Sequence, residues 1–197
     1  MQPPISLAIF ASGGGSNAEA ILQHATTSSH FSVKLIVTNN AQAGVLKRAE
    51  NHGIPAMVLD KTEYRDGAYL VKNLQDAGIQ MIALAGYLKL IPVELVRAFS
   101  GRMVNIHPSL LPNFGGKGMY GMRVHEAVIK AGSQRSGMTI HEVNEVYDQG
   151  KILRQVSLKV QQNWLPAQLQ QAVLRLEHRF YPLEVEKVAQ KLHTQTN

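Results

Sequence analysis

An amide and an imidazole stand two residues apart in the stretch VNIHPSLLP, residues 104–112. If this stretch ends a β-strand, Asn105 and His107 point to the same face, because side chains alternate along a strand. Pro108 has no backbone N–H and stops further strand pairing directly after them. A neutral donor beside a titratable ring can stabilise and protonate an oxygen atom. Two satisfied polar groups at the end of a strand would leave the same pattern.

A carboxylate that could serve this pair, Asp148, lies in the later segment VNEVYDQGKIL. An ionised carboxylate near His107 raises the pKa of the imidazole and fixes the orientation of the ring. Gly150 lets the backbone turn here, and an aspartate close to a glycine is also typical of an ordinary turn. The spacing alone does not establish that Asp148 meets His107.

The other histidines show no recognisable metal-binding pattern. His141 lies on an expected strand just before the Asp148 loop, but no HExxH or similar ligand spacing accompanies it. His125 and Glu126 begin an expected helix, where we expect both to be partly solvated. We therefore predict no metal ion.

A glycine-rich stretch, SGGGSN at residues 12–17, joins the first expected strand to the first expected helix. Glycines let the backbone approach a ligand closely, and the first turn of a helix offers free N–H groups at the positive end of its dipole. Ser16 and Asn17 add a hydroxyl and an amide that can bind phosphate oxygens. The spacing is neither GxGxxG nor a Walker loop. The stretch therefore indicates another kind of anion site or a purely structural turn.

A second glycine-rich segment, NFGGKGMYGM at residues 113–122, follows soon after His107. Exposed glycine-rich loops commonly close over active sites. We expect this segment to be a mobile lid over the site.

Apolar runs alternate with helical patterns through the first half of the chain. We expect strands at residues 5–10, 33–39, 54–60, 80–86 and 102–107, and helices at 18–25, 43–53, 63–77 and 92–100. Such alternation predicts a parallel sheet with helices on both faces. Open sheets of this kind bind ligands at the carboxyl ends of their strands, where the glycine-rich stretch and the Asn105–His107 pair both fall.

The pattern changes after residue 120. We expect a helix at 123–132, two antiparallel strands at 136–144 and 151–160, and a final helix at 166–193 that breaks near Pro182. No repeat or linker interrupts the sequence. We therefore predict one α/β domain, residues 1–197, with an open, mainly parallel sheet, helices on both faces and an antiparallel edge.

The composition restricts the class of protein. With 45% hydrophobic and 17% charged residues, the chain is expected to be globular rather than disordered. No apolar run approaches the ~20 residues that span a bilayer, and the first residues lack the basic region of a signal peptide. The sequence has no cysteine, which excludes disulfides and thiolate chemistry and fits a cytoplasmic protein. A formal net charge of +6 suggests an anionic partner or simply a basic surface that favours solubility.

Together, GGGSN, NIHPSLLP and YDQG resemble the folate-dependent formyltransferases, and the likeness covers nearly the whole chain. NIHPSLLP with a downstream aspartate is a strong marker of that family. The glycine-rich loop close to the N-terminus resembles its phosphoribosylglycinamide branch. The resemblance implies a formyltransferase-like fold and transfer of the formyl group of 10-formyltetrahydrofolate to the amine of phosphoribosylglycinamide, a step of purine biosynthesis.

Carried over by position, the resemblance also implies roles for individual residues. The implied catalytic residues are Asn105, His107 and Asp148. Those implied to bind the phosphoribosylglycinamide are Gly14, Gly15, Ser16, Asn17 and Glu177. Those implied to bind the folate are Arg65, Leu88, Lys89, Leu90, Ile91 and Asn105. Lys89 stands where the family often has arginine, and the 113–122 loop departs from the family's usual form.

The implied chemistry uses the residues singled out first. The substrate amine attacks the formyl carbon, and N–H groups of Asn105 and of a protonated His107 stabilise the negatively charged oxygen. His107 also serves as general acid. Asp148 would raise the pKa of His107 above its ordinary value of about 6.5.

Other functions remain open at this level. A formyltetrahydrofolate hydrolase normally carries an N-terminal regulatory domain, whereas the first strand here begins at residue 5. A methionyl-tRNA formyltransferase needs a C-terminal nucleic-acid-binding domain, for which we expect no residues, and another amine could be the acceptor. The chain could also be a basic nucleic-acid-binding module, but its sequence shows no cluster of basic and aromatic residues that would support this function. We expect small-molecule substrates, no nucleic acid, no membrane, and a monomer or weak homodimer.

Overall fold

Successive residues of the first strand, β1 (Ile5–Phe10), are buried on opposite faces of one sheet. In the computed structural model, which describes residues 3–195, Leu7 and Ile9 belong to one hydrophobic cluster and Ala8 and Phe10 to the other. Both faces of the strand are therefore covered, as expected for a central strand of a layered α/β protein.

The sheet has seven strands in the order β3-β2-β1-β4-β5-β6-β7. Neighbouring strands from β3 to β5 run parallel, whereas β6 is antiparallel to β5 and β7 is antiparallel to β6. The remaining strands are β2 (Phe31–Thr38), β3 (Ala56–Val58), β4 (Met81–Leu84), β5 (Met103–His107), β6 (Arg135–Glu142) and β7 (Ile152–Lys159). The predicted parallel sheet with an antiparallel edge is confirmed.

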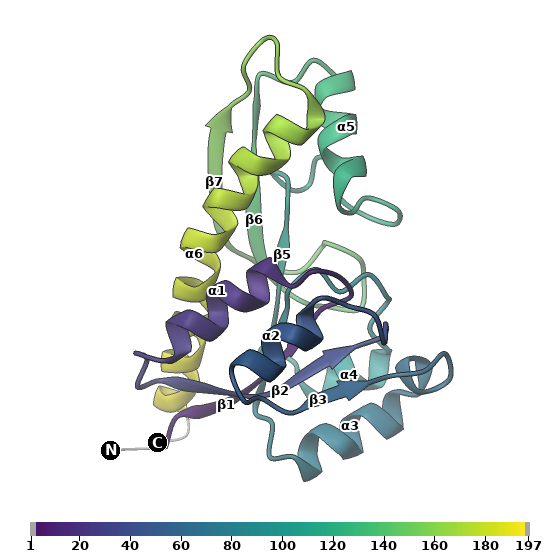
Figure 1. Cartoon of the computed structure of the whole chain (residues 1–197), viewed down its shortest axis with the longest axis vertical. Coiled ribbons are helices and arrows are strands. Elements are labelled where there is room, and N and C mark those ends of the chain that lie inside the picture. The colour runs from purple at the N-terminus through teal and green to yellow at the C-terminus, as the bar shows by residue number, and fades with distance from the viewer. Residues whose placement is uncertain (1–2, 196–197) are drawn as a thin grey trace.

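Helices cover the two faces unequally (Figure 1). Residues of α1, α2, α5 and α6 join the cluster around Leu7 and Ile9, and residues of α3 and α4 join the cluster around Phe10. The helices are α1 (Ser16–Ala25), α2 (Val45–Asn51), α3 (Gly67–Asp76), α4 (Val93–Ala98), α5 (Met122–Lys130) and α6 (Pro166–Gln195). The long α6 lies along the sheet and connects its parallel part with the β6–β7 edge (Figure 1).

The strand order reverses direction at β1. From β1 the chain proceeds to β2 and β3 on one side, and then returns to β4 and β5 on the other. The loops after β1 and β4 must therefore diverge, which creates a crevice at the carboxyl ends of these strands. The glycine-rich stretch follows β1, and the Asn105–His107 pair ends β5.

Two helices of the structure differ from those expected from the sequence. The helix expected at 63–77 is divided into a 3₁₀ turn (Glu63–Arg65) and α3. Asp66 causes the division, because its extended backbone places its carboxylate to accept the Tyr69 N–H at 2.9 Å as an N-cap. The expected break near Pro182 is wrong, since α6 continues through this residue. Packing of α6 onto the sheet outweighs the missing N–H.

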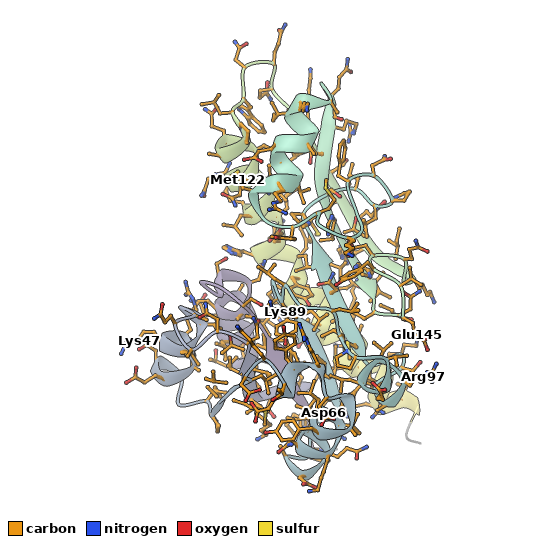
Figure 2. The ribbon with its side chains drawn as sticks, turned by 90° about the vertical axis from the view of Figure 1, so that its right-hand side faces the viewer. Lys47, Asp66, Lys89, Arg97, Met122 and Glu145 are labelled. Carbon is orange, nitrogen blue, oxygen red and sulfur yellow. The ribbon has the colours of Figure 1, made fainter. Side chains whose placement is uncertain are left out.

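The surface carries exposed ion pairs that join neighbouring segments. Arg97 of α4, for example, binds Glu145 in the loop after β6, with 2.8 Å between Nε and Oε1 (Figure 2). Both side chains are at least half exposed, so solvent screens the pair and it contributes little to stability. None of the helices within residues 3–195 is both long and apolar enough to cross a membrane.

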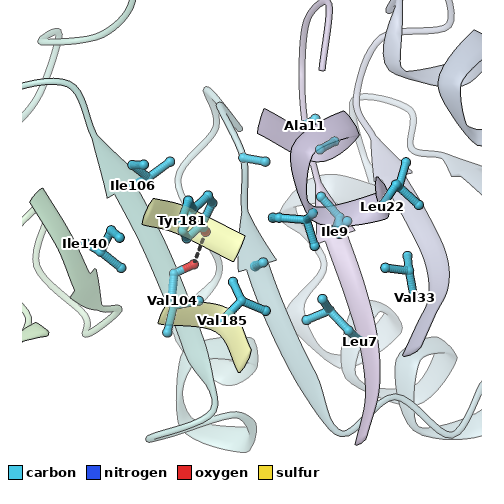
Figure 3. Packing of buried hydrophobic residues seen from close by; sticks show 14 of the residues in the cluster. Leu7, Ile9, Ala11, Leu22, Val33, Val104, Ile106, Ile140, Tyr181 and Val185 are labelled. Atoms are coloured by element: carbon cyan, nitrogen blue, oxygen red, sulfur yellow. Dashed lines mark hydrogen bonds between the residues drawn. The ribbon is translucent and has the colours of Figure 1, made fainter. Parts of the chain in front are cut away.

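Tyr181 of α6 anchors this helix to the middle of the sheet (Figure 3). Its side chain is fully buried, and its hydroxyl donates to the carbonyl oxygens of Leu84 at 2.9 Å and Val104 at 3.1 Å. These carbonyls belong to the adjacent strands β4 and β5. One hydroxyl thus fixes the helix over the two strands that lead into the crevice.

We expect Tyr181→Phe to lower the free energy of unfolding by about 1–2 kcal/mol, because the two carbonyls share a buried donor that phenylalanine lacks. Urea denaturation monitored by circular dichroism measures the change. Tyr147→Phe, at a side chain that is 41% exposed, is the control and should change stability little. Equal stability of the Tyr181 variant and the wild type would contradict the anchoring role.

Candidate active site

A cavity of about 590 Å³ opens at the carboxyl ends of β1, β4 and β5. Its walls include the glycine-rich stretch, the loop after β4, the end of β5, and the segments 116–121 and 143–148. Several large hydrophobic side chains that are at least 40% exposed stand on these walls: Leu88, Leu90, Tyr120, Val146 and Tyr147. An apolar mouth with polar groups inside is the usual form of a small-molecule site.

His107 and Asp148 meet inside this cavity, although they are far apart in the sequence. The Nδ1 atom of His107 lies 3.6 Å from Oδ2 of Asp148, and both side chains are largely buried. The opposite ring nitrogen, Nε2, is 2.8 Å from the carbonyl oxygen of Phe114, which can only accept a hydrogen bond. Nε2 therefore carries a proton, and protonation of Nδ1 would place the added charge beside the carboxylate.

Both groups that contact His107 belong to residues with left-handed backbone. Among residues 3–195, Phe114 with φ 56° and Asp148 with φ 54° are the two non-glycine residues with positive φ. Such conformations cost on the order of 1–3 kcal/mol each and persist where the surrounding structure imposes them. The fold therefore keeps two unfavourable conformations next to the same imidazole ring, which is typical of a functional site.

Asn105 has a partner that the sequence did not indicate. Antiparallel pairing of β5 with β6 places His141 directly opposite Asn105. Nδ1 of His141 is 2.8 Å from the Glu142 carbonyl, so it donates and leaves Nε2 to accept the Asn105 amide N–H at 3.0 Å. One N–H of Asn105 is thus fixed, and the second is available to the cavity.

The same carboxylate also contacts the second histidine. Oδ1 of Asp148 lies 3.5 Å from Nε2 of His141, and the Gly116 N–H donates to Oδ2 at 2.8 Å. Burial alone would raise the pKa of Asp148, but the neighbouring His141, the charge of His107 and the Gly116 N–H outweigh it and lower that pKa. Asp148 is therefore an ionised carboxylate between two imidazole rings.

The net effect on His107 differs from the prediction. Burial is the largest influence and lowers the pKa of His107, whereas the charge of Asp148 and the bond to Phe114 raise it only in part. Asp148 acts in the expected direction. The expectation that His107 has a pKa above its usual value is nevertheless wrong, because the ring is only 4% exposed.

A network of hydroxyl groups fixes the turn that follows His107. Thr139 Oγ1 accepts the Leu111 N–H at 3.0 Å and donates to the Ser109 carbonyl at 2.7 Å. Ser109 Oγ donates to the Asn113 carbonyl at 2.7 Å. Because Thr139 lies opposite His107 on β6, this network holds the start of the 113–122 loop against the sheet.

The residues predicted for the phosphoribosylglycinamide lie together on one wall. Gly14, Gly15, Ser16, Asn17 and Glu177 all line the cavity. Nδ2 of Asn17 donates to Oε2 of Glu177 at 2.6 Å and so joins residues 160 positions apart. Burial raises the pKa of Glu177, and the bond from Asn17 only partly opposes this.

The predicted folate residues fall into two groups. Leu88, Lys89, Leu90 and Ile91 line the cavity, and the Leu88 N–H donates to Ser12 Oγ at 2.9 Å. Arg65 does not line the cavity. Its guanidinium lies 5.5 Å from the centre of the Tyr64 ring, and Nζ of Lys89 lies 5.2 Å from the same centre. Two cations therefore lie close to one aromatic ring, and Lys89 is in the middle of the view in Figure 2.

Residues 116–121 of the 113–122 segment line the cavity, with Lys117, Met119 and Tyr120 on its wall, and the expected mobile lid stays a prediction. The chain then enters α5 at Met122 (Figure 2). The expectation that His125 is partly solvated is wrong, because its side chain is only 2% exposed and also lines the cavity. Its helix turns this face inward. Within residues 3–195, no group of three or more histidine, aspartate or glutamate side chains could hold a metal ion.

Comparisons with known proteins agree with this geometry. Residues 5–185 match the family model described as formyl transferase. The chain is 49% identical over 181 residues to the chloroplastic phosphoribosylglycinamide formyltransferase of Arabidopsis thaliana, covering 89% of this chain but only 62% of that protein. It is 34% identical to phosphoribosylglycinamide formyltransferase of Bacillus subtilis (strain 168), with 92% and 93% covered. The solved glycinamide ribonucleotide transformylase 1 from Symbiobacterium toebii has a TM-score of 0.87 at 30% identity, covering 95% of this chain and 89% of that one.

His125 should make stability depend on pH. Burial, helped by the charge of His107, lowers the pKa of His125 from 6.5 to about 4. The unfolded chain binds this proton near pH 6.5 and the folded chain only near pH 4, so the free energy of unfolding falls as the pH drops through this window. We expect His125→Gln to lose less stability between pH 7 and pH 4, by on the order of 3 kcal/mol. Urea denaturation at several pH values tests this, and parallel pH curves for the two proteins would contradict it.

Proposed function

The chain belongs to the formyl transferase family, and from this membership we propose that it transfers the formyl group of 10-formyltetrahydrofolate to the amine of phosphoribosylglycinamide. One observation carries the proposal. A single cavity holds the Asn105–His107–Asp148 cluster, the glycine-rich stretch at the start of α1, and the buried Glu177. These groups match the three parts of the reaction: an oxyanion, a phosphate and an amine.

The phosphate of the acceptor would bind at the glycine-rich stretch. Residues 13–17 line the cavity and include the first two residues of α1, a helix whose free N–H groups and dipole favour an anion at this end. Asn17, held by Glu177, would contact the same molecule. With its raised pKa, Glu177 suits an acceptor of the amine proton rather than a permanently charged group.

The folate would occupy the apolar mouth. Leu88 and Leu90 in the loop after β4 and Val146 in the loop after β6 offer exposed apolar surface for a flat ring system. Lys89 and Arg65, which flank Tyr64, supply positive charge for the carboxylates of the glutamate tail. The folate supplies the formyl group, and these residues orient it with water excluded.

Asn105 would stabilise the oxygen that becomes negatively charged when the amine attacks. Its amide has two N–H groups, of which His141 takes one at 3.0 Å. The second N–H is therefore already oriented, so little reorganisation is needed during the reaction. His141 acts through Asn105 and is a positioning residue.

His107 would donate the second hydrogen bond and serve as general acid. In the structure its Nε2–H is bonded to the Phe114 carbonyl, so the substrate oxygen must replace this partner or the ring must turn. Asp148 favours the protonated ring against the effect of burial. This arrangement makes His107 a readily dissociated acid, which matches transfer of a proton to the departing folate nitrogen.

The remaining expectations follow from the same proposal. Small molecules are the substrates expected for this cavity. The expected state of a monomer or weak homodimer stays a prediction. Cytoplasmic location also stays a prediction, which rests on the sequence having no cysteine. The Arabidopsis thaliana relative is named chloroplastic.

A transfer assay tests the proposal directly. Purified protein is incubated with 10-formyltetrahydrofolate and phosphoribosylglycinamide, with methionyl-tRNA and water as competing acceptors. We expect turnover that requires phosphoribosylglycinamide. Release of formate without any acceptor would instead indicate a hydrolase, and formylation of the tRNA would indicate a different acceptor.

We expect His107→Ala and Asp148→Asn each to reduce kcat by on the order of 10²-fold or more, because each change weakens a donor to the oxyanion. Asp76→Asn, at an exposed carboxylate paired with Lys72 on α3, is the matched control and should keep full activity. Circular dichroism verifies that the variants are folded. Turnover close to that of the wild type in either site variant would refute its role.

A further inference from the structure

Two carbonyl groups of the glycine-rich stretch are held by hydrogen bonds from α2. The Val45 N–H donates to the Gly13 carbonyl at 3.1 Å. Nε of Arg48 donates to the Gly14 carbonyl at 2.7 Å. Two consecutive carbonyls are thus fixed by one helix that lies behind the loop.

This anchoring determines where the loop's N–H groups point. In a planar trans peptide the C=O and the following N–H point in opposite directions. With the Gly13 and Gly14 carbonyls bound to α2, the N–H groups of Gly14 and Gly15 point away from that helix. Within residues 3–195 neither of these N–H groups has a hydrogen-bond acceptor. Both residues line the cavity.

The loop and α2 are also in close steric contact. Gly15 has φ 69°, and a Cβ atom placed on it would lie 2.7 Å from Cβ of Val45. A Cβ atom on Gly44 would lie 3.2 Å from Cα of Gly14. The glycines here permit the approach of two backbones, in addition to any approach of a ligand.

Arg48 is itself held in place by α1. Its Nη1 donates to Oε2 of Glu19 at 3.0 Å, and the other oxygen of Glu19 is bonded to Nε2 of His52 at 3.0 Å. The bond from His52 is the main reason that the pKa of Glu19 is lowered, so Glu19 is ionised near neutral pH. Arg48 lines a separate hollow that shares only Ser16 with the cavity.

We propose that Arg48 is a positioning residue for the phosphate group of the acceptor. It locks the Gly14–Gly15 peptide with its N–H toward the cavity and does not itself enter the cavity. The inference rests on the proposed function for the identity of the acceptor. Lysine in place of Arg48 would keep the charge but should not restore the full effect. The planar guanidinium bridges Gly14 and Glu19, and an ammonium group cannot reproduce that fork.

Binding of inorganic phosphate tests this without any catalysis. Phosphate is titrated into ¹⁵N-labelled wild type, R48M and R48K, and the dissociation constant is read from the amide shifts of Gly14 and Gly15. We expect the constant to rise about tenfold in R48M and to reach an intermediate value in R48K. K47M removes a neighbouring charge on α2 from a side chain that extends into solvent (Figure 2), and its dissociation constant should equal that of the wild type.

The possible outcomes are distinct. Wild-type binding by R48M would overturn the proposal. Wild-type binding by R48K would also overturn it, since charge alone would then suffice. An equal loss in K47M would show a general effect of net charge and would likewise overturn it.

The kinetic form of the same test separates positioning from a structural defect. We expect R48M to raise KM for phosphoribosylglycinamide about tenfold while KM for the folate and kcat stay within about twofold of the wild type. A rise in both KM values together with a fall in kcat would indicate a damaged fold and would overturn the proposal. If the wild type transfers no formyl group, the proposed function fails while the phosphate titration still decides the role of Arg48.

Discussion

A buried carboxylate between two imidazole rings governs this site. Asp148 faces Nδ1 of His107 at 3.6 Å and Nε2 of His141 at 3.5 Å, and its backbone adopts a left-handed conformation to do so. The loop that carries it must also press against β6, where a Cβ atom on Gly150 would lie 1.6 Å from the Glu142 carbonyl. Only glycine allows this approach. The antiparallel edge of the sheet therefore builds the site, since β5 carries His107, β6 carries His141, and the β6–β7 connection carries Asp148.

The groups that would act on the substrate are held by groups that do not touch it. His141 fixes one N–H of Asn105, Thr139 fixes the turn after His107, and Arg48 fixes a peptide of the glycine-rich stretch. Each of these bonds orients a donor before any ligand binds, which reduces the reorganisation needed later. The cost of this organisation appears in the unfavourable backbone conformations of Phe114 and Asp148 and in the lowered pKa of His107. The orientation of the donors in this site therefore depends on the sheet as a whole more than on any one loop.

Local patterns predicted the parallel strands, the antiparallel edge and the Asn105–His107 pair, because alternation of side chains is a property of a few neighbouring residues. Other features depend on long-range packing that no local pattern contains. The helix α6 continues through Pro182 because it packs on the sheet. His125 is buried because α5 turns the face that carries this residue inward. Pairing of Asn105 with His141 becomes predictable only when the register of β5 and β6 is known. Arg48 carried no signal, since an arginine in an amphipathic helix is ordinarily a solvated charge.

The Asp148 carboxylate raises the pKa of His107 against the opposing effect of burial. An NMR titration of the His107 ring in the wild type and in Asp148→Asn measures this effect. We predict that the pKa of His107 falls further in the variant, because the asparagine leaves burial uncompensated. The same pKa in both proteins would contradict this role of Asp148, because its charge would then have no effect on the protonation of His107.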